Sequence, residues 1–410
     1  MAIFVLWRET GVNTPDVARV FGNELKYVKE VLDTELRSSR GSIMMRRLEE
    51  AFASRFGSRY AISHVNGTAT LHSLLEAAGI GAGDEVIVPP LTMSSTTFAV
   101  LQANATPVFA DIDPETFQIR ADSIEQCRTT KTRAIITVAL FGLAPDMDPI
   151  MDLARKHKLF VIEDSAQCVL GEYKGRIVGT IGHGGSFSFQ SSKHITSGEG
   201  GMVVTDDPEV AGRVRKICSL GYAGVSASKG KITKKDIQDP DYSRHVSMGW
   251  NYRISELCAA VALAQLENID ALVERRIHSA ELLREAVRQC EWLIPQKTPT
   301  GCKNSYWTCA LRLNHPKVTW RMFRDRFMEL GGDGIYAAWK LSYLEPMFQS
   351  RSLLGREKFI SSETLNSYRK GLCPAAESIQ PQLLQLKTNY WNPVQAERQA
   401  EILKKTVESI

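Results

Sequence analysis

The sequence predicts an α/β protein with a large domain of residues 1–273 and a small α+β domain of residues 274–410. Short apolar segments alternate with amphipathic ones through the first half of the chain, a pattern that indicates a sheet of parallel strands covered by helices. The 410 residues are enough for one large and one small hydrophobic core. Hydrophobic residues make up 43% of the chain and charged residues 23%, which is typical of a globular protein.

The composition disfavours several other classes of protein. The net charge is only +4 and the basic residues are spread out, so we expect no nucleic-acid partner. The N-terminus lacks the basic segment of a signal peptide, and no apolar run approaches the length of a membrane span. The eight cysteines form no Cys-x-x-Cys pair and mostly fall in apolar segments. We therefore predict a cytoplasmic protein with free thiols, no membrane contact and no metal site.

The first 80 residues are predicted to form helix, helix, strand and helix. The helices span 14–36 and 44–56, and Gly57 ends the second of them. A strand at 60–65 leads into a helix that reaches about Ala78. The apolar face of the first helix is predicted to contain Val17, Val20, Phe21, Leu25 and Val28.

The turn between that strand and helix has the sequence Asn66-Gly67-Thr68. A strand that feeds a helix through such a turn presents free backbone N–H groups, and the positive end of the helix dipole, to an anion. A simple N-cap would give the same pattern, so the motif alone is weak.

Further strands and helices follow the same layout. Four apolar residues are followed by two acids, Glu163 and Asp164, which places Asp164 at the C-terminal end of a buried parallel strand. Ligands gather at that edge of an open α/β sheet, although an aspartate there can also be a helix N-cap. The segments predicted before it are a strand at 85–88, a helix from about 94, strands at 107–113 and 134–142, and a helix at 148–158.

Residues 186–205 are predicted to form strand, turn and strand, with Lys193 in the turn. A lysine on a fixed turn at the end of a buried strand can form a Schiff base. Burial or a nearby positive charge must then lower the pKa of its amine. A solvated turn lysine is the commoner interpretation of such a residue taken alone. The surrounding hydroxyl side chains suit a phosphate; they are Ser188, Ser191, Ser192, Thr196 and Ser197.

The second half of the chain is predicted to hold fewer chemical motifs. A helix at 206–218 precedes a basic segment at 226–245, either a solvated loop or a contact to an anionic substrate at a neighbouring active site. Ser255 caps a long helix that runs through Leu266 toward Arg276. Beyond it we predict a strand at 306–313, helices at 319–330 and 393–408, and an aromatic stretch at 335–348 that lines the substrate site; 387–391 has no assignment.

The stretch Ser186-Phe-Ser-Phe-Gln-Ser-Ser-Lys-His-Ile-Thr-Ser-Gly-Glu-Gly-Gly201 resembles the lysine motif of the DegT family of sugar aminotransferases, which depend on pyridoxal 5'-phosphate (PLP). The resemblance covers roughly residues 40–280 with several ordered motifs and continues more weakly to the C-terminus. It implies the type I fold of PLP-dependent transferases, with a mostly parallel seven-stranded sheet in the large PLP-binding domain.

The resemblance implies two catalytic residues. Lys193 holds PLP covalently and then moves a proton as general acid and base. Asp164 pairs with the pyridine nitrogen and so helps the ring to take up electrons. The other implied cofactor contacts are Gly67, Thr68 and Ser188 at the phosphate, Gln167 near the ring hydroxyl, and Met93 on the ring face, where the family usually has an aromatic residue.

A further motif, Gly249-Trp-Asn251-Tyr-Arg253, resembles the family's Gly-x-Asn-x-Arg sequence. In the family this asparagine reaches the PLP phosphate of the partner subunit. The resemblance therefore implies a homodimer with shared active sites. The family often has histidine where this chain has Ala139, so any substrate role of that histidine is absent.

The implied reaction moves an amino group from L-glutamate to a keto or aldehydo sugar. The segment Leu91–Ser95 and the ending at 386–391 look most like enzymes that convert 3,8-dideoxy-8-oxo-manno-octulosonate to 8-amino-3,8-dideoxy-manno-octulosonate for lipopolysaccharide. A nucleotide-linked keto-hexose is the alternative acceptor. A sugar dehydratase or deoxygenase is disfavoured because those relatives replace Lys193 with histidine. A non-catalytic sensor or regulator is disfavoured by the intact Lys193, Asp164 and Ser188.

Overall fold

The computed structural model describes residues 19–36 and 43–410, and its central element is a seven-stranded sheet. The strand order is β1-β9-β8-β5-β4-β2-β3. β9 is antiparallel to both of its neighbours and the other strand pairs are parallel, which confirms the predicted mostly parallel sheet. The strands are β1 (Tyr60–His64), β2 (Glu85–Val88), β3 (Thr106–Phe109), β4 (Thr132–Val138), β5 (Phe160–Asp164), β8 (Gly184–Ser188) and β9 (Gly201–Thr205).

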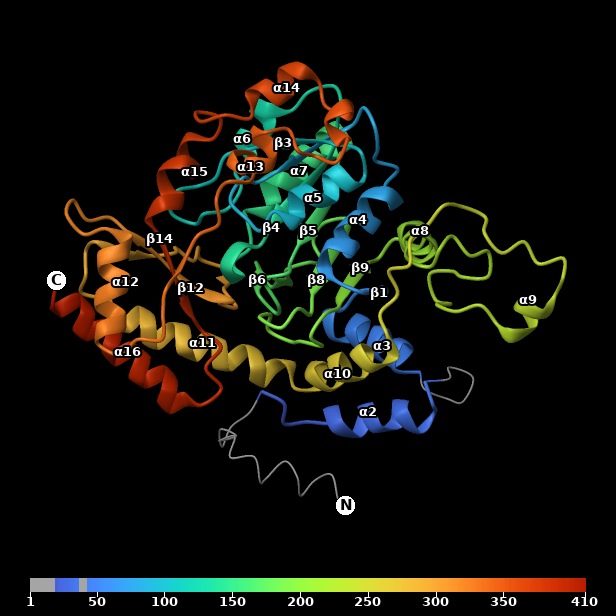
Figure 1. The fold of residues 1–410 in the computed structure, drawn as a ribbon, viewed down its shortest axis with the longest axis horizontal. Coiled ribbons are helices and arrows are strands. Elements are labelled where there is room, and N and C mark those ends of the chain that lie inside the picture. Colours follow the sequence, from blue (N-terminus) through green and yellow to red (C-terminus); the bar gives the residue numbers. More distant parts are fainter. Residues whose placement is uncertain (1–18, 37–42) are drawn as a thin grey trace.

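Helices cover both faces of this sheet (Figure 1). Along β9, Val203 packs into the core under α4, α5 and α8, whereas Met202 and Val204 pack into the core under α2, α3 and α10. Helices α6 and α7 pack against side chains of β2, β4 and β5 on that second face. The helices are α2 (Glu24–Asp33), α3 (Met44–Phe56), α4 (Gly67–Ala77), α5 (Ser95–Gln102), α6 (Ala121–Cys127), α7 (Met147–His157), α8 (Pro208–Cys218) and α10 (Glu256–Glu267).

The C-terminal part adds a smaller antiparallel sheet with the strand order β10-β12-β14-β13. Helices α11, α12 and α16 pack on it and close a separate core (Figure 1). The elements are β10 (Leu293–Pro295), β12 (Thr308–Leu313), β13 (Tyr336–Ala337), β14 (Leu383–Lys387), α11 (Ile269–Ala286), α12 (Trp320–Glu329) and α16 (Pro393–Glu408). Three short strands form a third sheet: β6 (Glu172–Tyr173), β7 (Arg176–Ile177) and β11 (Cys302–Lys303).

Helix α11 takes part in two cores. Leu272 and Val273 pack into the core shared with α2, α3 and α10, whereas Ala280 and Leu283 pack into the core of the smaller sheet. The division of the chain between residues 273 and 274 stays a prediction.

Residues 338–383 leave the smaller sheet and return to the large core (Figure 1). The Tyr368 hydroxyl donates to the Pro107 carbonyl at 2.6 Å, and the Arg356 side chain donates to the Leu101 carbonyl at 3.0 Å. This segment contains α13 (Pro346–Gln349), α14 (Ser362–Ser367) and α15 (Pro374–Ile379).

Several predicted elements differ from the structure. Of the predicted helix 14–36, residues 14–18 lie outside the described residues, and α2 begins only at Glu24. Its buried side chains are Glu24, Tyr27 and Val31, whereas Leu25, predicted to face inward, is 68% exposed. Contacts with α10 decide the orientation, because the Glu24 carboxylate accepts the Gln265 amide N–H at 2.5 Å. Local apolar spacing could not reveal that partner.

The long helix predicted from Ser255 is two helices. Ser255 caps α10 as predicted, since its hydroxyl accepts the Cys258 N–H at 3.1 Å. The first helix ends at Glu267, and α11 begins at Ile269 and continues beyond Arg276 to Ala286.

The basic segment 226–245 is exposed through most of its length and contains a short helix, α9 (Lys234–Gln238), that the sequence did not predict. Figure 1 shows α9 at the far right, away from both sheets. Within the described residues, no helix combines the length and the apolar character needed to cross a membrane.

Candidate active site

The candidate active site is a cavity of about 380 Å³ at the C-terminal ends of β5 and β8. These strands are parallel neighbours, with Asp164 paired to Ser186, so the side chains that end them meet at one edge of the sheet. The structure brings together seven of the eight predicted site residues as walls of this cavity: Gly67, Thr68, Met93, Asp164, Gln167, Ser188 and Lys193.

One side of the cavity is the N-terminus of α4. Asn66 caps the helix by accepting the Ala69 N–H at 2.8 Å. A Cβ on Gly67 would lie 2.9 Å from the Ser188 Cβ, so only glycine allows the helix to approach β8 this closely. The Thr70 hydroxyl donates to the Gly67 carbonyl at 2.6 Å and braces the turn. Backbone N–H groups, the helix dipole and the Ser188 hydroxyl are thereby gathered at one place, which fits a phosphate.

Asp164 is the acid of the cavity. It is 5% exposed, and its two carboxylate oxygens accept the Thr96 hydroxyl at 2.8 Å and the Ala166 N–H at 3.2 Å. Burial raises the pKa of Asp164, while these two hydrogen bonds and the charge of Lys193 oppose the rise. Within the described residues, no side-chain cation is hydrogen-bonded to this carboxylate. A protonated ring nitrogen would supply the missing cation.

Lys193 enters the same cavity from the turn that follows β8. Its backbone N–H donates to the Gln190 carbonyl at 2.9 Å, which fixes the turn. Burial of the amine lowers the pKa of Lys193 to about 8; the carboxylates of Asp164 and Glu199 oppose this shift and the Arg276 guanidinium adds to it. A neutral amine at moderate pH is what Schiff-base chemistry requires of a lysine.

The remaining wall comes from the C-terminal part of the chain and was missed from the sequence. Trp307 lies with its ring centroid 4.7 Å from Lys193 Nζ, and its indole N–H donates to the Ser192 carbonyl at 3.0 Å. Trp339 stacks on Trp307 with centroids 5.8 Å apart, and Phe141 stacks on Trp339 at 6.3 Å. The predicted aromatic stretch 335–348 was the one signal for this wall.

That prediction holds for only part of the stretch. Trp339 lines the cavity, and Tyr336 lines a neighbouring one, whereas Tyr343 and Phe348 are buried in the large core. Aromatic composition alone does not distinguish a cavity wall from a core.

The other predicted residues occupy three different settings. Met93 lines the cavity and is 49% exposed. Gln167 accepts the Phe141 N–H through its side-chain oxygen at 3.0 Å, so its amide N–H groups are the part left to meet a ligand. Asn251 is exposed and does not line its own chain's cavity. The backbone next to it is fixed, because the Tyr252 carbonyl accepts the Val65 N–H at 2.7 Å.

A phosphate cradle, a buried acid and a buried lysine around one cavity fit PLP. Comparisons with known proteins agree with this interpretation. Residues 20–385 match the DegT/DnrJ/EryC1/StrS aminotransferase family, and the chain belongs to this family. The protein is therefore an enzyme, a sugar aminotransferase of type I fold whose cofactor is PLP.

Two relatives are GDP-perosamine synthases. The one from Caulobacter vibrioides is 39% identical over 309 residues, which is 74% of this chain and 78% of the relative. The one from Escherichia coli O157:H7 is 38% identical over 290 residues, or 71% and 75%. Among solved structures, the aminotransferase from Psychrobacter cryohalolentis superimposes with a TM-score of 0.82 at 29% identity, covering 96% of this chain and 98% of its own.

The lowered pKa of Lys193 predicts how its amine responds to pH. The neutral fraction should rise about tenfold per pH unit up to about pH 8 and then level off. The rate at which the PLP-free protein takes up PLP should follow this curve. Borohydride reduction and peptide mapping should then find the phosphopyridoxyl group on Lys193. The Lys193→Ala variant should lose the adduct, and a trapped peptide carrying a different lysine would refute the assignment.

The position of Asp164 predicts the effect of Asp164→Asn. The amide keeps the shape of the side chain but cannot hold a proton on the ring nitrogen. The activation free energy should therefore rise by several kcal/mol, and each tenfold loss of kcat corresponds to about 1.4 kcal/mol. Steady-state kinetics, with a thermal melt as a check on folding, measure this. Asp148→Asn, on helix α7 and outside the cavity, is the matched control, although its half-exposed carboxylate is paired with Lys174 and Arg176. Near-normal turnover in Asp164→Asn would rule out the role.

Proposed function

We propose that this enzyme transfers the amino group of L-glutamate to the keto carbon of a nucleotide-linked keto-hexose. The two relatives named above are synthases of a GDP-linked product, and each is matched over about three quarters of its length. The octulosonate acceptor, with its place in lipopolysaccharide synthesis, stays a prediction that neither of these names supports.

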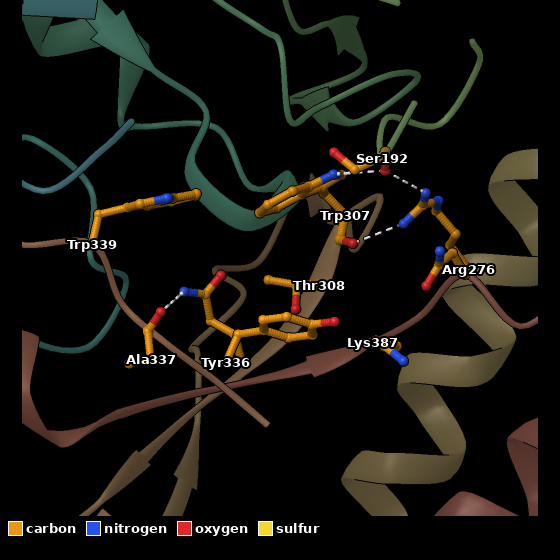
Figure 2. Close-up of a pocket in the computed structure, with 10 residues that line it drawn as sticks. Ser192, Arg276, Trp307, Thr308, Tyr336, Ala337, Trp339 and Lys387 are labelled. Atoms are coloured by element: carbon orange, nitrogen blue, oxygen red, sulfur yellow. Dashed lines mark hydrogen bonds between the residues drawn. The ribbon is translucent and has the colours of Figure 1, made fainter. Parts of the chain in front are cut away.

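The observation that carries the proposal is a second cavity of about 350 Å³, lined by Ser192 of the turn that carries Lys193 (Figure 2). It shares three lining residues with the PLP cavity, namely Ser192, Trp307 and Trp339. Figure 2 shows the two indoles on one side of this space and Tyr336 and Lys387 on the other. Aromatic faces combined with a few amide, hydroxyl and ammonium groups suit a polar ligand such as a sugar.

The second cavity therefore suits the part of the acceptor that does not react. A molecule that occupies both cavities would place its keto carbon beside the Lys193 amine and its other groups against the small sheet. Gln385, which lines the second cavity, is held by a hydrogen bond from its amide to the Ala337 carbonyl at 2.8 Å. Its side-chain oxygen is then available to accept a sugar hydroxyl.

Bound PLP supplies an electron sink for the carbon that loses its proton. Lys193 Nζ takes the proton from Cα of L-glutamate and, in the second half of the reaction, gives a proton to the acceptor. The Asp164 carboxylate holds the proton of the ring nitrogen. The Trp307 ring stabilises the ammonium form of Lys193 by a cation–π contact at 4.7 Å.

We also propose that the enzyme works in the cytoplasm as a homodimer with shared active sites. All eight cysteines lie in the described residues and all are free thiols, in keeping with a reducing compartment. The projecting segment around α9 and the exposed Asn251 suit contacts with a second subunit. Asn251 then completes the phosphate site of the partner.

Amino transfer to candidate acceptors tests the proposed substrate. The PLP-loaded enzyme with ¹⁵N-labelled L-glutamate should add one labelled nitrogen to a GDP-linked 4-keto-hexose, as measured by mass spectrometry. Lys193→Ala should give none. Transfer to 3,8-dideoxy-8-oxo-manno-octulosonate, with none to GDP-, UDP- or dTDP-linked keto-hexoses, would overturn the proposal in favour of the octulosonate.

Shared sites predict that two inactive variants rescue each other. Asn251→Asp should cost about 1.5–3 kcal/mol of PLP binding, because a charge-assisted hydrogen bond is lost. Mixed with Lys193→Ala subunits, it should form heterodimers in which one site carries both lesions and the other neither. Activity should reappear on mixing. If the subunits exchange and no activity returns, Asn251 does not act across the interface, and an active monomer in sedimentation would contradict the shared-site arrangement.

A further inference from the structure

Arg276, on helix α11, lies buried beneath the turn that carries Lys193. The residue is 1% exposed. One terminal nitrogen of its guanidinium donates to the carbonyls of Ser192 at 2.8 Å and Lys193 at 3.1 Å. The other donates to the Trp307 carbonyl at 2.8 Å and to the Thr388 hydroxyl at 3.3 Å. Figure 2 shows the guanidinium between Ser192 and Trp307.

These four hydrogen bonds use all four terminal N–H groups of the guanidinium. Arg276 borders the second cavity, but only its Nε–H is left without a partner, so no pair of N–H groups remains to grip a substrate carboxylate. Arg276 instead joins two parts of the chain that are distant in sequence. These are the lysine turn after β8 and the residues Trp307 and Thr388, which flank strands of the small sheet. Trp307, whose ring faces the Lys193 amine, is fixed by the same group.

A second arginine reaches the same turn. The Arg19 guanidinium donates to the carbonyls of Ser191 and Lys193. The side chains of both arginines lie within 6 Å of the Trp391 ring, Arg19 at 5.3 Å and Arg276 at 5.6 Å from its centroid. The segment 387–391 had no assignment from the sequence. In the structure its Thr388 and Trp391 contact the guanidinium groups, Thr388 that of Arg276 and Trp391 those of both arginines.

Neither guanidinium is paired with a carboxylate in the part of the chain that the structure describes, since all their hydrogen bonds go to neutral oxygens. Burial without an anionic partner lowers the pKa of Arg276 to about 9 and that of Arg19 to about 10. Retaining such charges in the interior is costly. A compensating function is therefore expected of them.

We propose that Arg276 is a positioning residue for the transamination: it fixes the lysine turn against Trp307 and places a buried positive charge behind the Lys193 amine. The inference rests on the proposed role of Lys193 but not on the identity of the acceptor. The charged groups that face the amine are Asp164 from β5, Glu199 from the glycine turn and Arg276 from α11. The two carboxylates favour the ammonium form, and Arg276 offsets them.

The geometry separates two effects that different variants can remove. Arg276→Met removes both the charge and the hydrogen bonds. Arg276→Lys keeps the charge but has only three donors and no planar fork, so it cannot hold all four acceptors. Arg275→Gln is the matched control, because Arg275 is the preceding residue of the same helix and faces Phe21 rather than the lysine turn.

The test measures the Lys193 amine in the PLP-free protein by its rate of reductive methylation between pH 6 and pH 10, followed by peptide mass spectrometry. The midpoint for the unchanged protein should lie at about pH 8. In Arg276→Met it should move up by about one unit, so that labelling at pH 7 slows about tenfold. In Arg275→Gln it should not move. A midpoint in a folded Arg276→Met protein that matches the control would overturn the electrostatic half of the proposal.

Arg276→Lys tests the positioning half and covers the case in which Arg276→Met does not fold. Its labelling midpoint should stay near pH 8, whereas kcat should fall at least tenfold with an unchanged KM for L-glutamate. A full kcat in Arg276→Lys would overturn the positioning role. The labelling readout needs neither cofactor nor acceptor, so a wrong acceptor assignment would leave it unaffected, and the two failures can be told apart.

Discussion

A primary amine has to lose its proton inside the protein, and the rest of the active site follows from this constraint. For a lysine with no charged neighbours, burial alone would lower the pKa of the amine. Here the amine of Lys193 shares its cavity with Asp164, which stays ionised beside the ring nitrogen in the proposed mechanism, and the negative charge of Asp164 favours the ammonium form. Two features of the fold lower the pKa of the amine. The cavity lies at the C-terminal ends of β5 and β8 in a sheet covered by helices on both faces, and guanidinium groups lie behind the lysine turn.

The residues that the sequence predicted are those whose function is encoded within a short stretch. Ser188 and Lys193 lie on one strand and its turn, Asp164 is the second of two acids after an apolar run, and Gly67 opens a helix after a strand. Each of these patterns is local, so each can be seen without the fold. The parallel arrangement of β5 and β8 then brings them together, and it too is indicated by the alternation of strands and helices.

The residues that the sequence did not predict act through partners far along the chain. Trp307 and Arg276 lie more than 80 residues beyond Lys193, in elements whose own patterns are those of an ordinary strand and helix. The prediction of which face of α2 is buried was wrong for the same reason, since Glu24 on that helix is hydrogen-bonded to the distant Gln265. Asn251 is a different case, because it does not line its own chain's cavity and its proposed role requires a second subunit. The acceptor is harder still, since the cavity proposed for it is lined by residues of the small sheet, of α11 and of the lysine turn, which meet only in the fold.

The return of residues 338–383 to the large core has a mechanical consequence. The C-terminal part is tied to the rest of the molecule by α11, by the pairing of β11 with β6, and by this returning segment, where the side chains of Tyr368 and Arg356 are hydrogen-bonded to large-core carbonyls. A domain that is connected to its neighbour at several places has little freedom to rotate about a single hinge. It can only slide by small amounts against its neighbour. We therefore expect substrates to enter along a path that needs no large movement of the small sheet, and we expect the residues at the rim of that path to select the sugars that are admitted.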